Sequence, residues 1–312
     1  MRSRAGRGTV VGVRAREPDR CGFAVRDGVR LYYEVFGGGP TTVLLLPSWA
    51  IVHSRMWKMQ VPDLARRSRV VTFDPRGNGR SDRPAGPASY THTELAADAV
   101  AVLEATGTGS AIGIGSSLGA AVLLRLAADH PHRVDGAVFV SPAVALDDAR
   151  PQRSPHGFDE EPDSDEGWAT FNAHYWRRDL EGFASFFFSQ AFVEAHSSKQ
   201  VQDCVGWASE TDAETLIATV RAPSPADSRD GEPEARRLAA RVRCPSLVLH
   251  GDLDRIVGPA TGPALAKALG CRLEIFHGAG HVLPARHPVR FNLVVRQFVE
   301  RVGEMGHARE RA

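Results

Sequence analysis

The feature that most constrains the fold is an alternation of short, β-rich apolar runs with helix-forming stretches. The runs TTVLLLP (41–47), RVVTFDPRG (69–77) and SAIGIG (110–115) have the length and composition of strands buried on both faces. Segments such as LGAAVLLRLAADH (118–130) separate them and favour helices. Helical connections of this kind join parallel strands. The sequence therefore predicts an α/β fold with a mostly parallel central sheet flanked by helices.

This alternation is interrupted once and then resumes. An acidic segment, an aromatic-rich helical segment and a turn-rich segment lie between residue 143 and residue 235, and PSLVLHG (245–251) and RLEIF (272–276) then return to the strand pattern. We expect a core formed by residues 21–142 and 236–302, with a helical cap inserted at 143–235. Residues 1–20, which contain six arginines, are expected to be a flexible basic arm, and residues 303–312 a C-terminal tail.

Composition excludes several classes of function. Lysine and arginine number 38 against 37 acidic residues, so the net charge of +1 favours neither nucleic acid nor an anionic membrane as a partner. No apolar run approaches the length of a membrane span, and the N-terminus lacks the apolar region of a signal peptide. The four cysteines have no CxxC spacing, which argues against a metal site. We expect a soluble, cytoplasmic protein, whose oligomeric state the sequence leaves open.

The segment GSSLG (115–119) fits the pattern G-x-S-x-G at the point where a buried strand gives way to a helix. A nucleophile on such a sharp turn needs small neighbours, because a Cβ at either glycine would collide with adjacent elements. Ser117 occupies the central position, and Ser116 becomes its neighbour. The start of the helix also offers free N–H groups to a developing anion.

A serine hydroxyl is a weak nucleophile unless a histidine acts as its base and a carboxylate orients that histidine. The strand-like run PSLVLHG (245–251) leads into a loop, within HGDLDRIVGP (250–259), that contains Asp252 and Asp254. The next run, RLEIF (272–276), leads into a loop, within EIFHGAGHVLP (274–284), that presents His281. All three groups follow parallel strands at their carboxyl ends, where loops converge on one crevice. From the residues alone, either aspartate could be the orienting acid.

These motifs, together with FDPRGNGRSDRP (73–84), resemble the α/β-hydrolase superfamily over nearly all of residues 22–302. The resemblance implies Ser117 as nucleophile, Asp254 as acid and His281 as base, and it implies an oxyanion hole formed by the backbone N–H groups of Trp49 and Leu118. One departure is Pro47-Ser48, where most relatives have His-Gly. The stretch HSSKQVQDCVGW (196–207) also resembles bacterial hydrolase modules found joined to nucleotide cyclases.

The aromatic-rich part of the insertion provides candidates for a pocket wall. Its rings could form the core of the cap, which helical spacing alone would produce, or could face the substrate. We take Trp176 and Phe187 as candidate substrate-binding residues, with Ser116 beside the nucleophile and His53 near the oxyanion loop. Such a wall predicts a mostly apolar pocket.

The expected function is that of a lid-bearing serine hydrolase that acts on a small ester, lactone or thioester and needs no metal or organic cofactor. Its only expected partner is that small-molecule substrate. An acyltransferase, a carbon–carbon bond hydrolase or a perhydrolase would use the same triad, and a non-catalytic ligand-binding module would keep the same fold. The sequence leaves these alternatives open.

Overall fold

The computed structural model describes residues 15–146, 157–223 and 231–310. Its centre is an eight-stranded sheet in the order β1-β2-β4-β3-β5-β6-β7-β8, in which β2 pairs antiparallel with both β1 and β4, and all other neighbouring strands pair parallel. The strands are β1 (Arg20–Arg26), β2 (Val29–Phe36), β3 (Thr42–Leu46), β4 (Arg69–Phe73), β5 (Ala111–Ser116), β6 (Val134–Val140), β7 (Ser246–Gly251) and β8 (Arg272–Phe276). The predicted mostly parallel sheet is confirmed.

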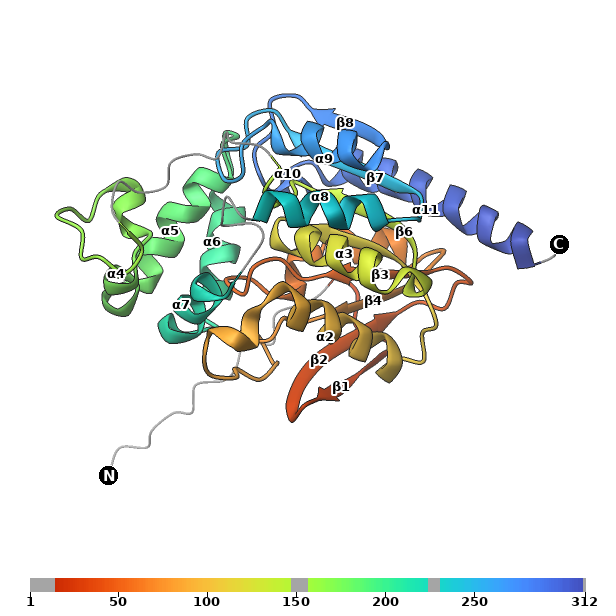
Figure 1. The fold of residues 1–312 in the computed structure, drawn as a ribbon, viewed down its shortest axis with the longest axis horizontal. Helices are drawn as coiled ribbons and strands as arrows, with labels where there is room; N and C mark the ends of the chain where they lie inside the picture. Colours follow the sequence, from red (N-terminus) through yellow and green to blue (C-terminus); the bar gives the residue numbers. More distant parts are fainter. Residues whose placement is uncertain (1–14, 147–156, 224–230, 311–312) are drawn as a thin grey trace.

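Helices cover both faces of the sheet (Figure 1). The helices of the core are α1 (Val61–Leu64), α2 (His92–Ala105), α3 (Leu118–Asp129), α8 (Gly231–Arg241), α9 (Thr261–Leu269), α10 (Leu283–Arg286) and α11 (Pro288–Glu310). Side chains of α2, α3, α8 and α9 pack in one apolar cluster, and those of α1 and α11 pack in another. The strand β3 shows why its sequence is apolar throughout: Val43 and Leu45 belong to one cluster, and Leu44 and Leu46 to the other.

Within the described residues, four further helices follow β6 and precede α8, and they lie at one end of the core (Figure 1); we call them the cap. They are α4 (Ala173–Arg178), α5 (Leu180–Ala191), α6 (Ser198–Ala208) and α7 (Ala213–Arg221). The short 3-10 helix at Gly167–Thr170 precedes them. Trp176 and Phe183 are fully buried at their centre, with ring centroids 4.5 Å apart. Most of the cap aromatics therefore form an apolar core, as helical spacing favours.

Three boundaries differ from those expected. The predicted end of the cap at 235 falls inside α8, whose Ala235 and Leu238 pack with the core. Asp19, at the end of the predicted arm, is fixed because its N–H donates to Val35 O at 2.9 Å, whereas residues 1–14 of that arm lie outside the described residues. The predicted tail is also helical, since α11 continues to Glu310. Two glycines there do not outweigh the helix formers around them.

Candidate active site

The strand-to-helix turn after β5 holds Ser117 in the conformation expected of a nucleophile elbow. Its φ of 56° and ψ of −119° are unfavourable for a residue with a side chain, and its N–H donates to Val140 O at 2.9 Å. A Cβ at Gly115 would lie 2.2 Å from Gly119 O, and one at Gly119 would lie 2.3 Å from Pro47 O. Neither position accommodates a side chain, which is the reason that the sequence pattern predicted.

The loop after β7 and the loop after β8 bring Asp254 and His281 into contact. Asp254 is 3% exposed, and its Oδ2 lies 2.7 Å from Nδ1 of His281. Its other oxygen, Oδ1, accepts hydrogen bonds from the backbone N–H groups of Ile256 at 2.8 Å and Val257 at 3.2 Å. A carboxylate that accepts several N–H bonds is both oriented and kept ionised.

A second histidine, which was not predicted as a site residue, contacts the same carboxylate. Nε2 of the fully buried His250 lies 3.1 Å from Oδ2 of Asp254. Burial acts to raise the pKa of Asp254, but the charge of His281 and the hydrogen bonds from His250 and His281 outweigh it, and the pKa falls well below its usual value. Since an ionised carboxylate only accepts, His250 carries its proton on Nε2. The segment HGDLDR includes His250, but the sequence pattern marks this residue only as the end of a buried strand.

Asp252, the other aspartate of this loop, contacts different partners. Its carboxylate binds His277 Nδ1 at 2.9 Å and accepts the N–H of Gly278 at 2.7 Å, so it holds the turn that follows β8. The sequence alone left the two aspartates equivalent. Their contacts separate them, because only Asp254 is hydrogen-bonded to His281.

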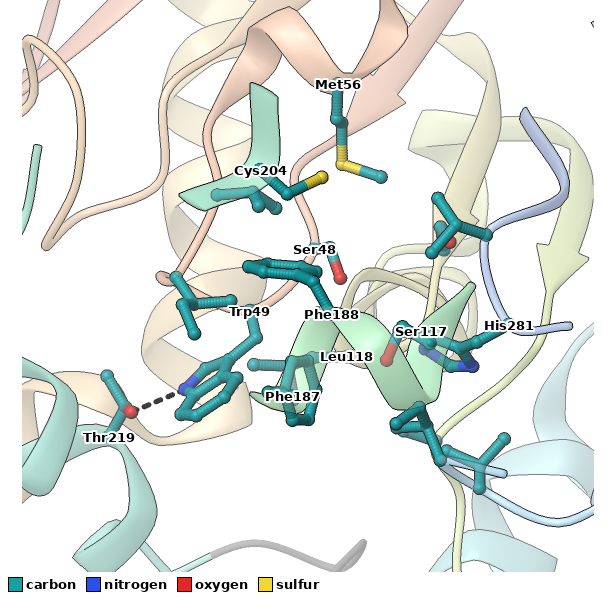
Figure 2. A pocket seen from close by; sticks show the side chains of 18 of the residues that line it. Ser48, Trp49, Met56, Ser117, Leu118, Phe187, Phe188, Cys204, Thr219 and His281 are labelled. Carbon is teal, nitrogen blue, oxygen red and sulfur yellow. Dashed lines mark hydrogen bonds between the residues drawn. The ribbon is translucent and has the colours of Figure 1, made fainter. Parts of the chain in front are cut away.

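A cavity of about 350 Å³ opens beside these groups. In Figure 2, Ser117 and His281 lie side by side, and Trp49, Leu118, Phe187 and Phe188 gather next to them. The two residues of the expected oxyanion hole, Trp49 and Leu118, thus border the same cavity. Where most relatives have His-Gly, this chain has Pro47-Ser48. Ser48 lines the cavity, and the carbonyl of Pro47 lies against Gly119.

The side chain of Trp49 is held by the cap. Its Nε1–H donates to Oγ1 of Thr219 in α7 at 2.7 Å, the dashed line in Figure 2. Its ring packs against Phe187 of α5, with centroids 5.6 Å apart, and against Trp176 at 5.7 Å. The hydroxyl of Thr219 in turn donates to Leu216 O at 2.6 Å, so both its hydrogen-bonding roles are filled.

Two of the four candidate substrate-binding residues border the cavity and two do not. Ser116 and Phe187 line it. Trp176 lies behind the wall, where its Nε1–H donates to Thr170 O at 2.9 Å. His53 is 3% exposed and binds outward to Glu210 of the cap, Nε2 to Oε1 at 3.3 Å. Both side chains are used in packing between the cap and its surroundings, so the structure does not bring them to the cavity.

Further wall residues came from parts of the sequence without a motif. Phe188 of α5, Cys204 of α6 and Thr219 of α7 line the cavity, and so does His92 at the start of α2. Burial, with a smaller effect from Arg125, lowers the pKa of His92 to about 4, so its imidazole is neutral at pH 7. Burial also raises the pKa of the Cys204 thiol to about 12. No aspartate, glutamate, lysine or arginine is among the described residues that line this cavity.

Residues 15–146, 157–223 and 231–310 offer neither a metal cluster nor a membrane-spanning helix. These ranges contain no group of three or more histidine, cysteine, aspartate or glutamate side chains placed to hold a metal ion. None of the helices described there is long and apolar enough to cross a membrane.

Known proteins resemble the chain at two levels of coverage. A protein of Azorhizobium caulinodans provisionally named carbamate hydrolase RutD is 37% identical over 111 residues, which span 36% of this chain and only 40% of that relative. The pimeloyl-[acyl-carrier protein] methyl ester esterase of Aeromonas hydrophila is 28% identical over 269 residues, 85% of this chain and 98% of the esterase.

The fold is also found among solved structures. The enol-lactonase from Burkholderia xenovorans LB400 superposes with a TM-score of 0.73 at 24% identity and covers 89% of this chain and 100% of its own. The family model described as the alpha/beta hydrolase fold matches residues 41–288, more than half of the chain. The serine on its strand-to-helix elbow, the histidine bound to a buried aspartate and the strands β3 to β8 all lie within that match. The chain therefore belongs to the α/β hydrolase family.

Proposed function

We propose that the protein is a serine hydrolase that cleaves a small, apolar carboxylic ester, lactone or thioester through an acyl-enzyme on Ser117. One observation carries this proposal. Ser117, on its strained turn, and His281, whose Nδ1 lies 2.7 Å from the buried carboxylate of Asp254, border the same cavity. This is the arrangement that an activated serine requires.

Each member of the triad has one chemical role. Because Nδ1 of His281 is hydrogen-bonded to Asp254, Nε2 is the nitrogen left to take the proton from Ser117 as its oxygen attacks the carbonyl carbon. The resulting imidazolium then gives that proton to the leaving group. Asp254 keeps the imidazole in the required tautomer and stabilises its charged form. In the second half of the reaction, His281 activates the water that releases the acid.

Backbone N–H groups of Leu118 and Trp49 are the proposed oxyanion hole. Leu118 is the first residue of α3, so its N–H has no acceptor within the helix and lies at the positive end of the helix dipole. Trp49 is kept in place by its indole bond to Thr219 at 2.7 Å. Each such donor contributes about 3 kcal/mol to the stabilisation of a transition state.

The wall of the cavity favours a neutral substrate. Apart from two histidines, the described lining contains no acidic or basic side chain, and burial keeps His92 neutral at pH 7. Phe187 and Phe188 supply an apolar surface, with Ser116 beside the nucleophile. A volume of about 350 Å³ is near the lower end for ligand sites, which favours a small acyl group. The names of the methyl ester esterase and the enol-lactonase support esters and lactones.

We also propose that the helices α4–α7 act as the lid of this site, since Phe187 of α5, Cys204 of α6 and Thr219 of α7 all line it. The rival reactions share Ser117, Asp254 and His281 and differ in what attacks the acyl group or which bond breaks. Product analysis with a competing alcohol, peroxide or diketone separates acyl transfer, perhydrolysis and carbon–carbon hydrolysis from ester hydrolysis.

The test is a panel of neutral esters, lactones and thioesters of increasing acyl length, assayed with the wild-type protein and with Ser117→Ala. We expect turnover of short, uncharged substrates, a fall in kcat/KM for those with a carboxylate in the acyl part, and loss of all turnover in Ser117→Ala. A folded wild-type protein that turns over none of them would favour the ligand-binding module instead.

A further inference from the structure

The loop that presents His281 is hydrogen-bonded to the cap. Ala191, the last residue of α5, and the four residues after it run alongside this loop, and we call residues 191–195 the α5 exit segment. The N–H of His281 donates to Ala191 O at 3.0 Å, and the guanidinium of Arg286 donates to Ala195 O at 2.5 Å. The candidate base and the short helix after it are therefore both hydrogen-bonded to backbone carbonyls of the cap.

Glu194 of the same segment contributes a carboxylate to the loop. One of its oxygens, Oε1, accepts the N–H of Gly280 at 2.9 Å and also lies 3.2 Å from Nε2 of His287. Gly280 directly precedes His281, and His287 follows it by six positions. A single oxygen thus joins the chain on both sides of His281, and the side chain that carries it is only 10% exposed.

Packing alone does not account for a glutamate at this position. Its second oxygen, Oε2, is buried and has no hydrogen-bond partner among the described residues. Leaving a buried polar atom without a partner costs free energy, which an apolar side chain of similar size would avoid. What the glutamate adds is the pair of contacts made by Oε1.

The backbone around these contacts is closely fitted. A Cβ at Gly280 would lie 2.8 Å from Ala191 O, so the loop approaches the exit segment as nearly as a glycine allows. On the cap side, the hydroxyl of Ser197 donates to Glu194 O at 2.7 Å and closes the turn in which Glu194 lies. The carboxylate is therefore presented from a turn with its own internal hydrogen bond.

We propose that Glu194 is a positioning residue. By accepting hydrogen bonds from Gly280 and His287, it holds the loop that presents His281 to Ser117, so the placement of the base depends on the cap. This inference rests on the proposed role of His281 and goes beyond it, because it assigns a function to a cap residue that does not border the substrate cavity. A small displacement of a catalytic group costs a large part of the rate, so the expected effect is on turnover.

The test compares three variants with the wild-type protein on one neutral ester. Glu194→Ala removes both hydrogen bonds, and we expect kcat to fall about 10-fold or more while KM changes less than about threefold. Glu194→Gln keeps an oxygen that can accept both bonds, and we expect it to retain at least about half of the activity. Glu181→Ala, which removes an exposed carboxylate from α5 itself, is the matched control and is expected to behave as wild type.

A second measurement does not depend on the chemistry. Amide hydrogen exchange in the peptide covering 277–287 is expected to rise in Glu194→Ala and to stay at the wild-type level in Glu194→Gln, because the N–H of Gly280 loses its acceptor only in the first. Wild-type kcat and exchange in a folded Glu194→Ala would overturn this inference alone. So would a loss in Glu194→Gln equal to that in Glu194→Ala, since charge and not hydrogen bonding would then be responsible.

The proposed function fails in a different way. A folded wild-type protein whose Ser117 is not phosphonylated by a fluorophosphonate would overturn that function, and with it the positioning role of Glu194. Phosphonylation of the wild-type protein together with equally fast phosphonylation of Glu194→Ala would leave the function standing and overturn only the positioning role.

Discussion

The core and the cap contribute to the site in different ways. The core supplies the proposed reacting groups, each at the carboxyl end of a parallel strand: Ser117 after β5, Asp254 after β7 and His281 after β8. The cap supplies walls and supports: Phe187 lines the cavity, and Thr219 binds the indole of Trp49. The comparison indicates that the chemistry depends on short loops after the strands of the sheet. The placement of the surrounding loops and the choice of substrate depend instead on cap helices that are far away in the sequence.

If that division holds, the largest loss comes from the core. Ser117→Ala is expected to lower kcat by at least about 10⁴-fold, because it removes the oxygen proposed to form the acyl-enzyme. The neighbour Ser116, which is buried in the same wall, is the matched control. Ser116→Ala is expected to stay within about 10-fold of wild type in steady-state ester hydrolysis, and equal losses in the two variants would contradict the assignment.

The next effect separates the two aspartates of one loop. Asp254→Asn is expected to lower kcat by about 10³- to 10⁴-fold, because an amide can donate to Nδ1 of His281 and so stabilise the wrong tautomer. Asp252→Asn changes a carboxylate that binds His277 and Gly278, and we expect less than about a threefold change. Steady-state kinetics on the same ester measures both. A greater loss of kcat in Asp252→Asn than in Asp254→Asn would contradict the assignment of Asp254 as the orienting acid.

The buried acid also predicts how stability depends on pH. The pKa of Asp254 is lowered in the folded protein, so its contribution is fully present above the pKa of an unfolded aspartate, about 4, and is lost as the pH falls below it. Removing one partner of a buried pair costs about 3 kcal/mol. The free energy of unfolding should therefore differ most between wild type and Asp254→Asn at neutral pH, and the difference should shrink in denaturant titrations below about pH 4.

A support from the cap is expected to matter less than the triad. Thr219→Val keeps the shape of the side chain but leaves the indole N–H of Trp49 without its acceptor, which costs about 1–2 kcal/mol of stability. We expect kcat to fall several-fold through the oxyanion hole, with Thr219→Ser close to wild type because it keeps the hydroxyl. An unchanged kcat in a folded Thr219→Val would show that the cap does not support this loop.

The smallest effect concerns the contact between His53 of the core and Glu210 of the cap. Burial acts to lower the pKa of His53, but Asp74 and Glu210 outweigh it, and the pKa is raised above 6.5. The stability gained from the charged imidazole is thus complete below about pH 6.5 and is lost as the pH rises through the raised pKa.

Because Glu210 is partly exposed, we expect a decrease of less than about 1 kcal/mol in the free energy of unfolding between pH 6 and pH 9. Chemical denaturation across that range measures it, and Glu210→Gln should make the dependence flatter. A Glu210→Gln variant with the full wild-type pH dependence would show that Glu210 of the cap does not contribute to the pH dependence of stability.

The same contrast explains what the sequence could predict. The elbow was predictable because its backbone geometry requires glycine at two positions. A Cβ at Gly115 or Gly119 would lie only 2.2 Å or 2.3 Å from a backbone carbonyl oxygen. Strands buried on both faces are recognisable from composition alone, as β3 is. The choice between Asp252 and Asp254 required the family resemblance, since both lie in one loop and differ only in what they contact.

The cap could be predicted as helical and aromatic, but not which rings face the substrate. Phe187 and Trp176 both have helical neighbours and aromatic bulk, and only the packing of α4 on α7 and of α5 on α6 puts one in the wall and the other behind it. His250 and Glu194 were missed for a similar reason. Their partners lie 4 and 86 or more positions away, and neither residue is part of a spacing that local chemistry demands.

Activation of Ser117 by His281 within a folded site is the claim on which the proposed chemistry depends. Labelling with a fluorophosphonate, followed by mass spectrometry of the modified peptide, tests it most directly. We expect one adduct per folded chain, located on Ser117. No adduct should form when the protein is denatured before labelling, and the adduct should form far more slowly in His281→Ala. A folded wild-type protein that remains unlabelled, or an adduct on Ser116, would contradict it.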